Sequence, residues 1–340
     1  MEEVLKYFLQ KIYKKSMHCN IPVFIPHLAC NHSCIFCNQR FISGQIQVPS
    51  AVQVKKTIDL YLSTIREGTE VEVAFFGGSF TGLDIETQNK YLQVVQPYIK
   101  EGKVKSIRLS TRPDYINEQI LDNLKINNVS DIELGAQSLD DKILLFAERG
   151  HIAKDITKAS SLIKNYGFNL GLQMMIGLPL DTKEKSINTA RAIIDLGAKT
   201  TRIYPTLVIE NTTLATLYRQ GKYKPLSMEQ AVEWTKEVYK VFAHTDIKIL
   251  RVGLHPSKDL ISGKGYLAGP FHISFFELVL SALWKEKLLG LQVGVRTLYV
   301  NPKDINYIIG YKSRNKDIIK RRCLNIVQTE EIKQGEFATM

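Results

Sequence analysis

The 340-residue sequence contains no apolar run long enough to cross a bilayer and no recognisable secretory leader. Glu2 and Glu3 stand where a leader would carry basic residues. The most apolar stretch, residues 271–284, is too short to span a membrane and contains His272 and Glu277, so we interpret it as a core helix. These absences exclude a membrane-spanning chain, and we expect a cytoplasmic protein with no membrane partner.

Cysteine is scarce, with five residues in the chain, and only three of them lie close together. Cys30, Cys34 and Cys37 fall within eight residues, a spacing that suits a metal better than disulfide bonds. Cys19 lies eleven residues before Cys30, and Cys323 is remote, so we interpret both as ordinary thiols. This cysteine usage predicts a reducing compartment.

Acidic residues are outnumbered, since 45 Lys and Arg stand against 34 Asp and Glu and give a formal charge of +11. Such an excess favours polyanionic partners such as RNA or phosphorylated metabolites. A solvated, lysine-rich surface explains the excess equally well. The same two interpretations apply to the basic tail, which contains Lys312, Arg314, Lys316, Lys320, Arg321 and Arg322.

Short apolar runs alternate with helical patterns about six times in the first two thirds of the chain. The predicted strands cover residues 23–25, 71–76, 106–110, 132–134, 169–176 and 201–205. The predicted helices between them cover residues 52–66, 85–99, 116–125, 140–147, 153–166 and 183–196. Repeated strand–helix units are typical of parallel sheets with crossover helices, so we predict an α/β fold with a partial (β/α)6 TIM-like barrel.

The barrel core is expected at residues 21–206, with a further part on each side. An N-terminal helix is expected at residues 1–20, because apolar and lysine positions segregate in the first fifteen residues. A small C-terminal α/β extension is expected at residues 207–340, with helices near residues 229–243 and 276–289 and a strand near residues 247–252. We expect this extension to face the substrate or a partner.

Glycine and polar clusters follow the predicted strands at one end. The cysteines follow the first strand, and the later strands run into Gly77-Gly78-Ser79, Thr111-Arg112-Pro113-Asp114, Gly135-Ala136-Gln137-Ser138 and Gly177-Leu178-Pro179. In barrels of parallel strands the active site lies at the carboxyl ends of the strands. The sequence therefore predicts one site built from several strand ends.

The clustered cysteines follow the spacing C-x3-C-x2-C. Three thiolates at this spacing can each bind a different iron of a cubane 4Fe–4S cluster, which leaves the fourth iron open for a substrate or cofactor. A structural zinc site with His27 or His32 as fourth ligand is an alternative, although no second C-x2-C is present. A redox pair of Cys34 and Cys37 is another alternative, but it leaves Cys30 without a role.

With Phe36 before its last cysteine, this motif resembles that of the radical S-adenosylmethionine superfamily. The resemblance extends to about residue 205 and is closest to the branch that contains the Elongator catalytic subunit and the oxygen-independent coproporphyrinogen oxidases. The segments that carry it run from Phe75 to Thr81, Thr111 to Tyr115, Glu133 to Ser138, Arg149 to His151 and Met175 to Pro179.

The resemblance implies a 4Fe–4S cluster on Cys30, Cys34 and Cys37, with S-adenosylmethionine chelated to the open iron. An electron from an external one-electron reductant then yields methionine and a 5′-deoxyadenosyl radical. Many relatives carry Glu or Thr where this chain has Ser79. The residues implied around S-adenosylmethionine are Phe36, Gly77, Gly78, Ser79, Gln137, Arg149 and Ile176.

Most of these residues have a role that follows from their chemistry. Gly77 and Gly78 lack a Cβ, so backbone carbonyls can approach the methionine amine. Arg149 can pair with the methionine carboxylate through its planar guanidinium. Gln137 would bind the ribose, and Ile176 would cover the adenine. The plainer alternatives are a tight turn for the glycines, a surface charge at a helix end for Arg149 and a core position for Ile176.

We therefore predict a radical S-adenosylmethionine enzyme, with RNA as the first choice of substrate because of the Elongator-like motifs and the basic charge. The alternatives are a coproporphyrinogen-oxidase-like enzyme of small molecules and a non-catalytic iron–sulfur protein that binds RNA. An acetyltransferase domain like that of the Elongator subunit is not expected, since no glycine-rich acetyl-coenzyme A loop follows residue 290. Candidate residues on the substrate side are Arg112, Asp114, Tyr115, Arg202, Tyr204 and Arg251.

Overall fold

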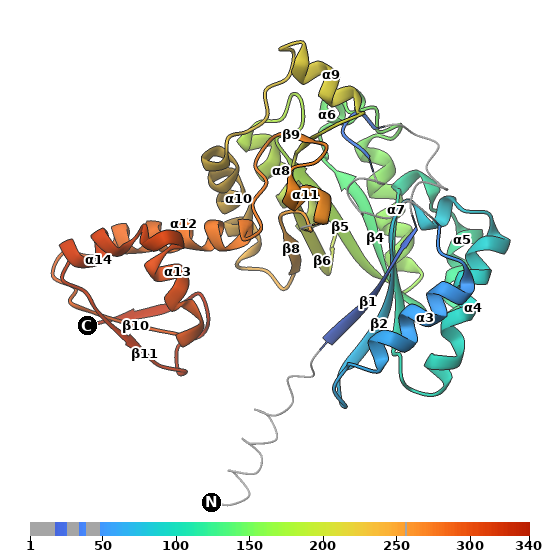
Figure 1. The fold of residues 1–340 in the computed structure, drawn as a ribbon, viewed down its shortest axis with the longest axis horizontal. Helices are drawn as coiled ribbons and strands as arrows, with labels where there is room; N and C mark the ends of the chain where they lie inside the picture. The colour runs from blue at the N-terminus through green and yellow to red at the C-terminus, as the bar shows by residue number, and fades with distance from the viewer. Residues whose placement is uncertain (1–17, 26–33, 39–47, 256) are drawn as a thin grey trace, which may run out of the picture.

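Seven parallel strands form the central sheet, in the order β1-β2-β3-β4-β5-β6-β8 (Figure 1). The computed structural model describes residues 18–25, 34–38, 48–255 and 257–340. The sheet curls into a half-barrel flanked by helices, which confirms the predicted partial barrel. Its strands are β1 (His18–Ile25), β2 (Glu70–Gly77), β3 (Ser106–Thr111), β4 (Val129–Gln137), β5 (Asn169–Ile176), β6 (Thr200–Pro205) and β8 (Lys248–Val252).

Helices alternate with these strands along the chain. Those between β1 and β6 are α3 (Ala51–Leu62), α4 (Ile85–Lys100), α5 (Glu118–Ile126), α6 (Asp141–Phe146), α7 (Ala153–Asn165) and α8 (Lys183–Asp195). The chain after β6 forms α9 (Thr213–Arg219), α10 (Met228–Phe242), α11 (Lys258–Ser262) and a separate pair of short strands, β7 (Val208–Ile209) and β9 (Tyr266–Ala268).

All six predicted strands are present, and the structure adds two differences. The strand expected near residues 247–252, β8, pairs with β6, so the central sheet continues beyond residue 206 into the region assigned to the extension. β1 begins at His18 and pairs with β2, so the last three residues of the expected N-terminal helix belong to the sheet. The rest of that expected helix lies outside the described residues.

Polar capping residues set where the outer helices begin. Ser50 accepts a hydrogen bond from the backbone N–H of Gln53, and the Gln53 side chain binds the Ser50 N–H in return. Asp84, Asn117 and Asp140 cap α4, α5 and α6 in a similar way. Caps of this kind satisfy N–H groups that a helix leaves without partners. They fix the loops that join the carboxyl ends of β2, β3 and β4 to their helices.

Alternate residues of the strands pack against these helices and form the main apolar core. Val73, Ile107, Leu109, Ile132 and Leu172 are all fully buried in it. The period of two follows from the pleat of a strand, which points successive side chains to opposite faces. Burying each such side chain stabilises the fold by about 2 kcal/mol.

The other face of the sheet carries charged residues instead. Arg108 lies among three carboxylates, with its Nη2 atom 2.7 Å from Asp131 Oδ1 and its Nε and Nη1 atoms each 3.2 Å from Glu72 and Glu133. Arg202 contacts Glu133 from β6, with an Nε–Oε2 distance of 2.6 Å. We call these five residues the inner charge row. Each charge has an opposite partner, which offsets the cost of removing it from water.

Gly171 makes room for the inner charge row. A Cβ atom at this position of β5 would lie 2.7 Å from Thr200 Oγ1 and 2.8 Å from Glu133 Cγ, closer than atoms can pack. The absent side chain therefore lets Glu133 lie flat against the neighbouring strand. Gln173, also on β5, adds an amide donor 3.3 Å from Glu133 Oε2.

Residues 291–340 form a small lobe at one side of the barrel (Figure 1). In this lobe β10 (Thr297–Val300) pairs in parallel with β11 (Asn325–Gln328) and antiparallel with β12 (Phe337–Thr339), and α13 (Ile305–Ile309) and α14 (Lys316–Arg321) complete it. The helix α12 (Phe275–Gly290) joins the lobe to the barrel.

One helix contributes to two cores. Val279 of α12 belongs to the main apolar core, and Trp284 and Leu288 belong to the core of the lobe. Residues 275–284 of the most apolar stretch lie in this helix, which packs in both cores as the predicted core helix, whereas residues 271–274 precede it. Within the part of the chain that the structure describes, no helix is both long and apolar enough to cross a membrane.

We expect Glu133→Gln to lower the free energy of unfolding by about 3 kcal/mol, because it removes the negative charge that faces two buried arginines. Chemical denaturation followed by circular dichroism measures this loss. Glu67→Gln, at an exposed position, is the matched control and should change the free energy by less than about 0.5 kcal/mol. Equal losses in the two variants would contradict the role of the inner charge row.

Candidate active site

The cysteine loop follows β1 at its carboxyl end and is described over residues 34–38. Cys30, the first predicted cluster ligand, lies outside the described residues. Two backbone hydrogen bonds fix the loop: Ile35 N–H donates to the Ala147 carbonyl after α6 at 3.2 Å, and Leu214 N–H of α9 donates to the Ile35 carbonyl at 2.7 Å. Segments far apart in the sequence therefore hold the loop at one end of the barrel.

Ile35 and Phe36 anchor the same loop in a small apolar cluster. Both side chains are buried. The other buried members of the cluster are Cys34, Ile143, Ala147, Leu178, Val208, Leu214, Ala215 and Tyr223. Because Cys34 and Cys37 flank the two anchors, burial of the anchors fixes both cysteines. The contact of Phe36 with a cofactor stays a prediction.

Two buried arginines converge on the sulfur of Cys34. Arg149 Nη1 lies 3.0 Å from this Sγ, and Arg149 Nη2 donates to the Gly135 carbonyl at 2.5 Å. Arg112 Nη1 lies 3.7 Å from the same sulfur, while the rest of its guanidinium binds the carboxylate of Asp114 and the carbonyl of Arg149. N–H donors and positive charge thus face a predicted cluster ligand.

Arg149 lies in a tight turn that follows α6. Its neighbours Glu148 (φ 52°) and Gly150 (φ 69°) are both left-handed, a conformation that is costly for a residue with a side chain. The turn directs the guanidinium inward, so that Arg149 is only 6% exposed. The alternative of a surface charge at a helix end is therefore wrong.

Gln137 ends β4 in a strained conformation with φ 65°, where the pairing with β5 shifts register. A Cβ atom on Gly135 would lie 3.0 Å from Gln137 Nε2 and 3.5 Å from Arg149 Nη2. The amide and the guanidinium therefore meet over this glycine. The structure brings these two predicted site residues together, and the glycine gives them the space.

The Gly77-Gly78 pair draws the end of β2 onto the end of β1. Gly77 has φ 108°, and a Cβ there would lie 2.9 Å from the Ile25 carbonyl oxygen. Gly78 N–H donates to the same oxygen at 2.8 Å. Ser79 is buried and precedes the short 3-10 helix η1 (Phe80–Gly82). Close approach of two strands thus explains Gly77, and its contact with a methionine amine stays a prediction.

The end of β5 is held by a buried carboxylate. Asp181 Oδ2 accepts hydrogen bonds from Gly177 N–H and from the Ser186 hydroxyl, each at 2.8 Å. Burial raises the pKa of Asp181 to about 6, although these donors favour the ionised form. Tyr223 donates to the Gly177 carbonyl at 2.7 Å. The adjacent Ile176 side chain is fully buried in the main core, so its adenine contact also stays a prediction.

Several buried polar atoms at this site have no hydrogen-bond partner among the described residues. They are Gln137 Oε1, Arg149 Nε and both ring nitrogens of His151. Buried polar groups without partners are rare in folded proteins and mark places where a ligand or water binds. These atoms offer both donors and acceptors, and they fit a ligand as polar as S-adenosylmethionine.

His151 is a site residue that no feature of the sequence marked individually. It is 4% exposed. Burial, together with the nearby guanidiniums of Arg149 and Arg112, lowers the pKa of His151 to about 4, so its ring is neutral at pH 7. The sequence signal was its place in Arg149-Gly150-His151, but only the structure gives its burial.

The substrate-side candidates divide into two groups. Arg112 and Asp114 form an ion pair beside Cys34, and the Arg112 guanidinium lies 5.6 Å from the ring centre of Tyr115. Arg202 belongs to the inner charge row, and Arg251 Nε donates to the Gly253 carbonyl at 3.0 Å. Burial raises the pKa of the Tyr204 phenol on the same strand as Arg202.

The described residues include two of the three clustered cysteines. Among all the residues that the structure describes, no group of three or more His, Cys, Asp or Glu side chains lies in a metal-binding arrangement. Cys19 lies near the start of β1 and Cys323 lies exposed in the lobe. The three-cysteine cluster site therefore stays a prediction, supported by the donors around Cys34.

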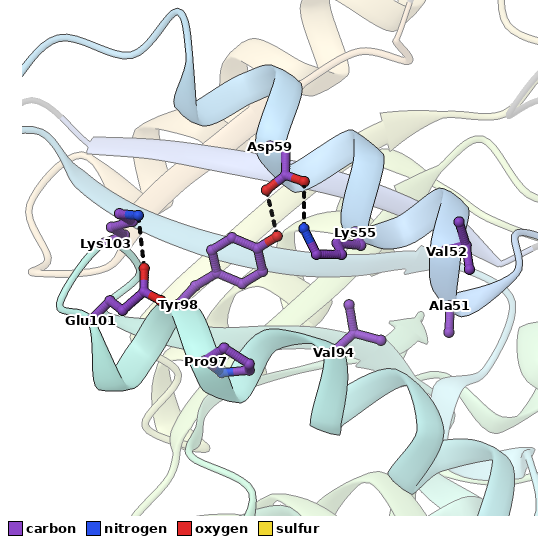
Figure 2. Close-up of a pocket in the computed structure, with 9 residues that line it drawn as sticks. All are labelled: Ala51, Val52, Lys55, Asp59, Val94, Pro97, Tyr98, Glu101 and Lys103. Atoms are coloured by element: carbon purple, nitrogen blue, oxygen red, sulfur yellow. Dashed lines mark hydrogen bonds and ion pairs between the residues drawn. The ribbon is translucent and has the colours of Figure 1, made fainter.

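A separate hollow of about 480 Å³ lies between α3 and α4 (Figure 2). In it the Asp59 carboxylate accepts hydrogen bonds from Lys55 Nζ at 2.8 Å and from the Tyr98 hydroxyl at 2.5 Å. Lys103 pairs with Glu101 at 2.7 Å. Because these charged groups are paired with one another, the hollow offers no charge to a ligand, and we do not assign it to the active site.

Two family models match the sequence. The one described as the Radical SAM superfamily matches residues 24–193, and the one described as the Radical_SAM C-terminal domain matches residues 198–285. The first range includes every residue predicted around the cluster and S-adenosylmethionine.

Three relatives illustrate the similarity. The tRNA uridine(34) acetyltransferase of Methanocaldococcus jannaschii is 28% identical over 202 residues, which are 54% of this chain and 37% of that protein. Elongator complex protein 3 of Homo sapiens is 27% identical over 260 residues, which are 70% of this chain and 46% of that protein. An uncharacterised protein of M. jannaschii is 30% identical over 243 residues, which are 67% and 71%. This chain spans less than half the length of the first two.

Solved structures share the fold. Elp3 of Methanocaldococcus infernus, with an N-terminal deletion, has a TM-score of 0.65 and 21% identity over 80% of this chain and 64% of that chain. SuiB of Streptococcus suis bound to S-adenosylmethionine has a TM-score of 0.50 and 15% identity over 80% of this chain and 57% of that chain. At these identities the likeness establishes the architecture alone.

We expect Cys34→Ala to lose the visible absorption and most of the iron of the anaerobically reconstituted protein, because it removes one of three cluster ligands. Absorption spectra and a colorimetric iron assay measure both. Cys323→Ala removes an exposed thiol of the lobe and should keep the spectrum and the iron. Full iron content in Cys34→Ala would disprove the ligand assignment.

We expect the stability of the cluster-free protein to decrease as the pH falls from about 6.5 towards 4, in part because of His151. The unfolded imidazole binds a proton near its ordinary pKa of 6.5, whereas the buried ring stays neutral down to about 4. His151→Gln should therefore show a shallower decrease over this window in denaturant titrations. His244→Gln, at an exposed position, should follow the unmodified protein. Identical pH profiles for all three proteins would refute this assignment.

Proposed function

This chain belongs to the radical SAM superfamily, and we propose from that premise that it is a radical enzyme whose substrate is RNA. The matched superfamily range, residues 24–193, is half of the chain. As a member of this superfamily, the chain is an iron–sulfur enzyme that uses S-adenosylmethionine. The observation that carries the site assignment is the pair of buried guanidiniums, Arg149 and Arg112, beside the sulfur of Cys34.

Cys30, Cys34 and Cys37 would hold the 4Fe–4S cluster through three of its irons. When bound, the cluster supplies the electron that cleaves S-adenosylmethionine to methionine and a 5′-deoxyadenosyl radical. The described residues fit such a group. Cys34 is buried beside two guanidiniums, and apolar contacts fix the loop between Cys34 and Cys37.

The two arginines act on the sulfur of Cys34. N–H donors and positive charge beside a thiolate ligand favour the more negative, reduced state of a cluster, and hydrogen bonds to sulfur are a recognised determinant of its potential. The effect is strong here because both arginines are buried, where the effective dielectric constant is low. Arg149 Nε, which has no partner among the described residues, is available to the methionine carboxylate.

Gln137 and His151 would orient the bound S-adenosylmethionine. The Gln137 Oε1 atom accepts hydrogen bonds, as a ribose hydroxyl requires. His151 is neutral at pH 7 and offers one donor and one acceptor without adding a charge beside Arg149. Cys34, Arg112, Arg149 and His151 are all buried, and burial of the reacting groups would protect a radical from side reactions.

RNA is the proposed substrate class for two reasons. Curated relatives from M. jannaschii and M. infernus are named tRNA uridine(34) acetyltransferases, although this chain spans only 37% and 34% of their lengths. The net charge of +11 suits a polyanion. The radical would abstract hydrogen from a nucleotide of the RNA or add to it.

The test measures 5′-deoxyadenosine by liquid chromatography. Cluster-loaded protein with dithionite and S-adenosylmethionine should release 5′-deoxyadenosine slowly, and bulk tRNA should increase the rate severalfold because a positioned substrate accepts the radical. Cys34→Ala, assayed alongside, should release none.

Two results would overturn the proposal separately. No release by protein with full iron content would contradict the radical chemistry. Release that proceeds at the same rate with tRNA, with DNA of similar length and with buffer alone would contradict RNA as the substrate.

A further inference from the structure

We propose that the C-terminal lobe holds the phosphate backbone of RNA on a basic ridge that consists of Lys312, Arg314, Lys316, Lys320 and Arg321. The ridge binds RNA without reading its sequence. It keeps the RNA on the enzyme while a distant nucleotide occupies the active site. This inference rests on the proposed RNA substrate and adds the surface that retains it.

The five side chains of the ridge are exposed, and none of them forms an ion pair with a carboxylate in the part of the chain that the structure describes. Asp317 is the one acidic residue in the segment 312–321. Elsewhere the chain does pair its lysines, since Lys236 and Lys240 of α10 both contact Glu286 of α12, at 2.7 and 2.8 Å. The ridge is thus a concentration of uncompensated positive charge, which attracts polyanions.

The structure separates Arg322 from the ridge. Its guanidinium donates to the carbonyls of Leu291 at 2.9 Å and Leu289 at 2.8 Å, at the carboxyl end of α12. Arg322 therefore stabilises the lobe, and its substitution would not test RNA binding. No such contact with backbone carbonyls ties the five ridge side chains among the described residues.

The backbone holds the ridge in one arrangement. Lys312 and Ser313 are left-handed, with φ of 52° and 63°, in the turn before α14. Asn315 is buried and donates to the Ser281 carbonyl of α12 at 3.1 Å. A Cβ on Gly310 would lie 2.9 Å from Asn315 Nδ2, the nitrogen that donates to the Ser281 carbonyl, so the glycine leaves room for this hydrogen bond. Because the backbone is already ordered, the entropy cost of binding is confined to the lysine and arginine side chains.

The chemistry of the ridge favours phosphates over bases. Tyr311, the aromatic residue beside it, is half-buried. Its ring centre lies 5.1 Å from that of His272 and 5.7 Å from Lys312 Nζ, so a base that stacked on Tyr311 would compete with both contacts. Lysine and arginine bind phosphate oxygens in any sequence. Five charges spread along a turn and a helix match successive phosphates of a chain better than one small anion.

The ridge belongs to a part of the chain that the two family models do not cover. The models end at residue 285, and the lobe begins at residue 291. In Figure 1 the lobe stands beside the barrel at the far end of α12, away from α7 and α5. RNA on the ridge would therefore extend from the lobe to the barrel.

The test measures binding of fluorescently labelled bulk tRNA to the full, cluster-loaded chain by anisotropy at several salt concentrations. The ridge variant is Arg314→Glu/Lys320→Glu/Arg321→Glu. The control variant is Lys56→Glu/Lys154→Glu/Lys158→Glu, which makes the same change of charge at exposed positions of α3 and α7. Iron content and thermal melting check that each variant is intact.

We expect the affinity of the ridge variant for tRNA to fall about tenfold or more, whereas that of the control changes less than about twofold. In a plot of log affinity against log salt concentration, the slope of the ridge variant should become shallower by about two, which corresponds to about two lost phosphate contacts. If the Glu variant does not fold, the Gln substitutions at the same three positions remove the charges with less disturbance and should give the same direction of change.

The outcomes separate the ridge from the proposed substrate. Equal affinities of the ridge variant and the unmodified protein would overturn the ridge, as would equal losses in the ridge and control variants or no binding of tRNA by the unmodified protein. If the ridge variant alone loses binding but tRNA does not stimulate 5′-deoxyadenosine release, the ridge stands and RNA as the substrate falls. If tRNA stimulates 5′-deoxyadenosine release and the ridge variant binds tRNA with unchanged affinity, RNA as the substrate is supported and the ridge is contradicted.

Discussion

The carboxylate of Glu133 lies between the guanidiniums of Arg108 and Arg202, and this arrangement fixes the inner face of the half-barrel. The three residues come from three strands, and Arg108 also reaches Glu72 on β2. A slip of one strand by one residue would leave a charge unpaired in a dry interior, which is strongly unfavourable. The register of the sheet, and with it the spacing of the strand ends, depends on these pairs.

Because the strands are held at a fixed spacing, the residues at their carboxyl ends are brought together at one site. Gln137 and Arg149 meet over Gly135 because a bulge ends β4 and a left-handed turn follows α6. Arg149 then spans the gap to Cys34, so one side chain joins the fourth strand to the loop after the first. Backbone strain at such positions is tolerated only where surrounding contacts enforce it, and here the contacts are buried hydrogen bonds.

The sequence predicted the architecture, because apolar periodicity and strand-end glycines are local signals. It identified β8 as a strand but not as part of the barrel, since pairing with β6 across α9 and α10 is a long-range contact. It expected Arg112 on the substrate side and gave no sign of the contact between Arg112 and Cys34, because that contact joins residues far apart in the chain. The neutrality of His151 follows from burial, which no local pattern reports.

The shared helix α12 has a geometrical consequence. Val279 packs in the barrel core and Trp284 packs in the lobe core, so the rotation of the lobe about this axis is set by the number of residues between them. Each residue of an α-helix turns the chain by about 100°. Insertion of a single residue between these two anchors would leave both cores chemically complete and swing the lobe to another side of the barrel. The number of residues between the two anchors of α12 thus determines on which side of the barrel the lobe lies.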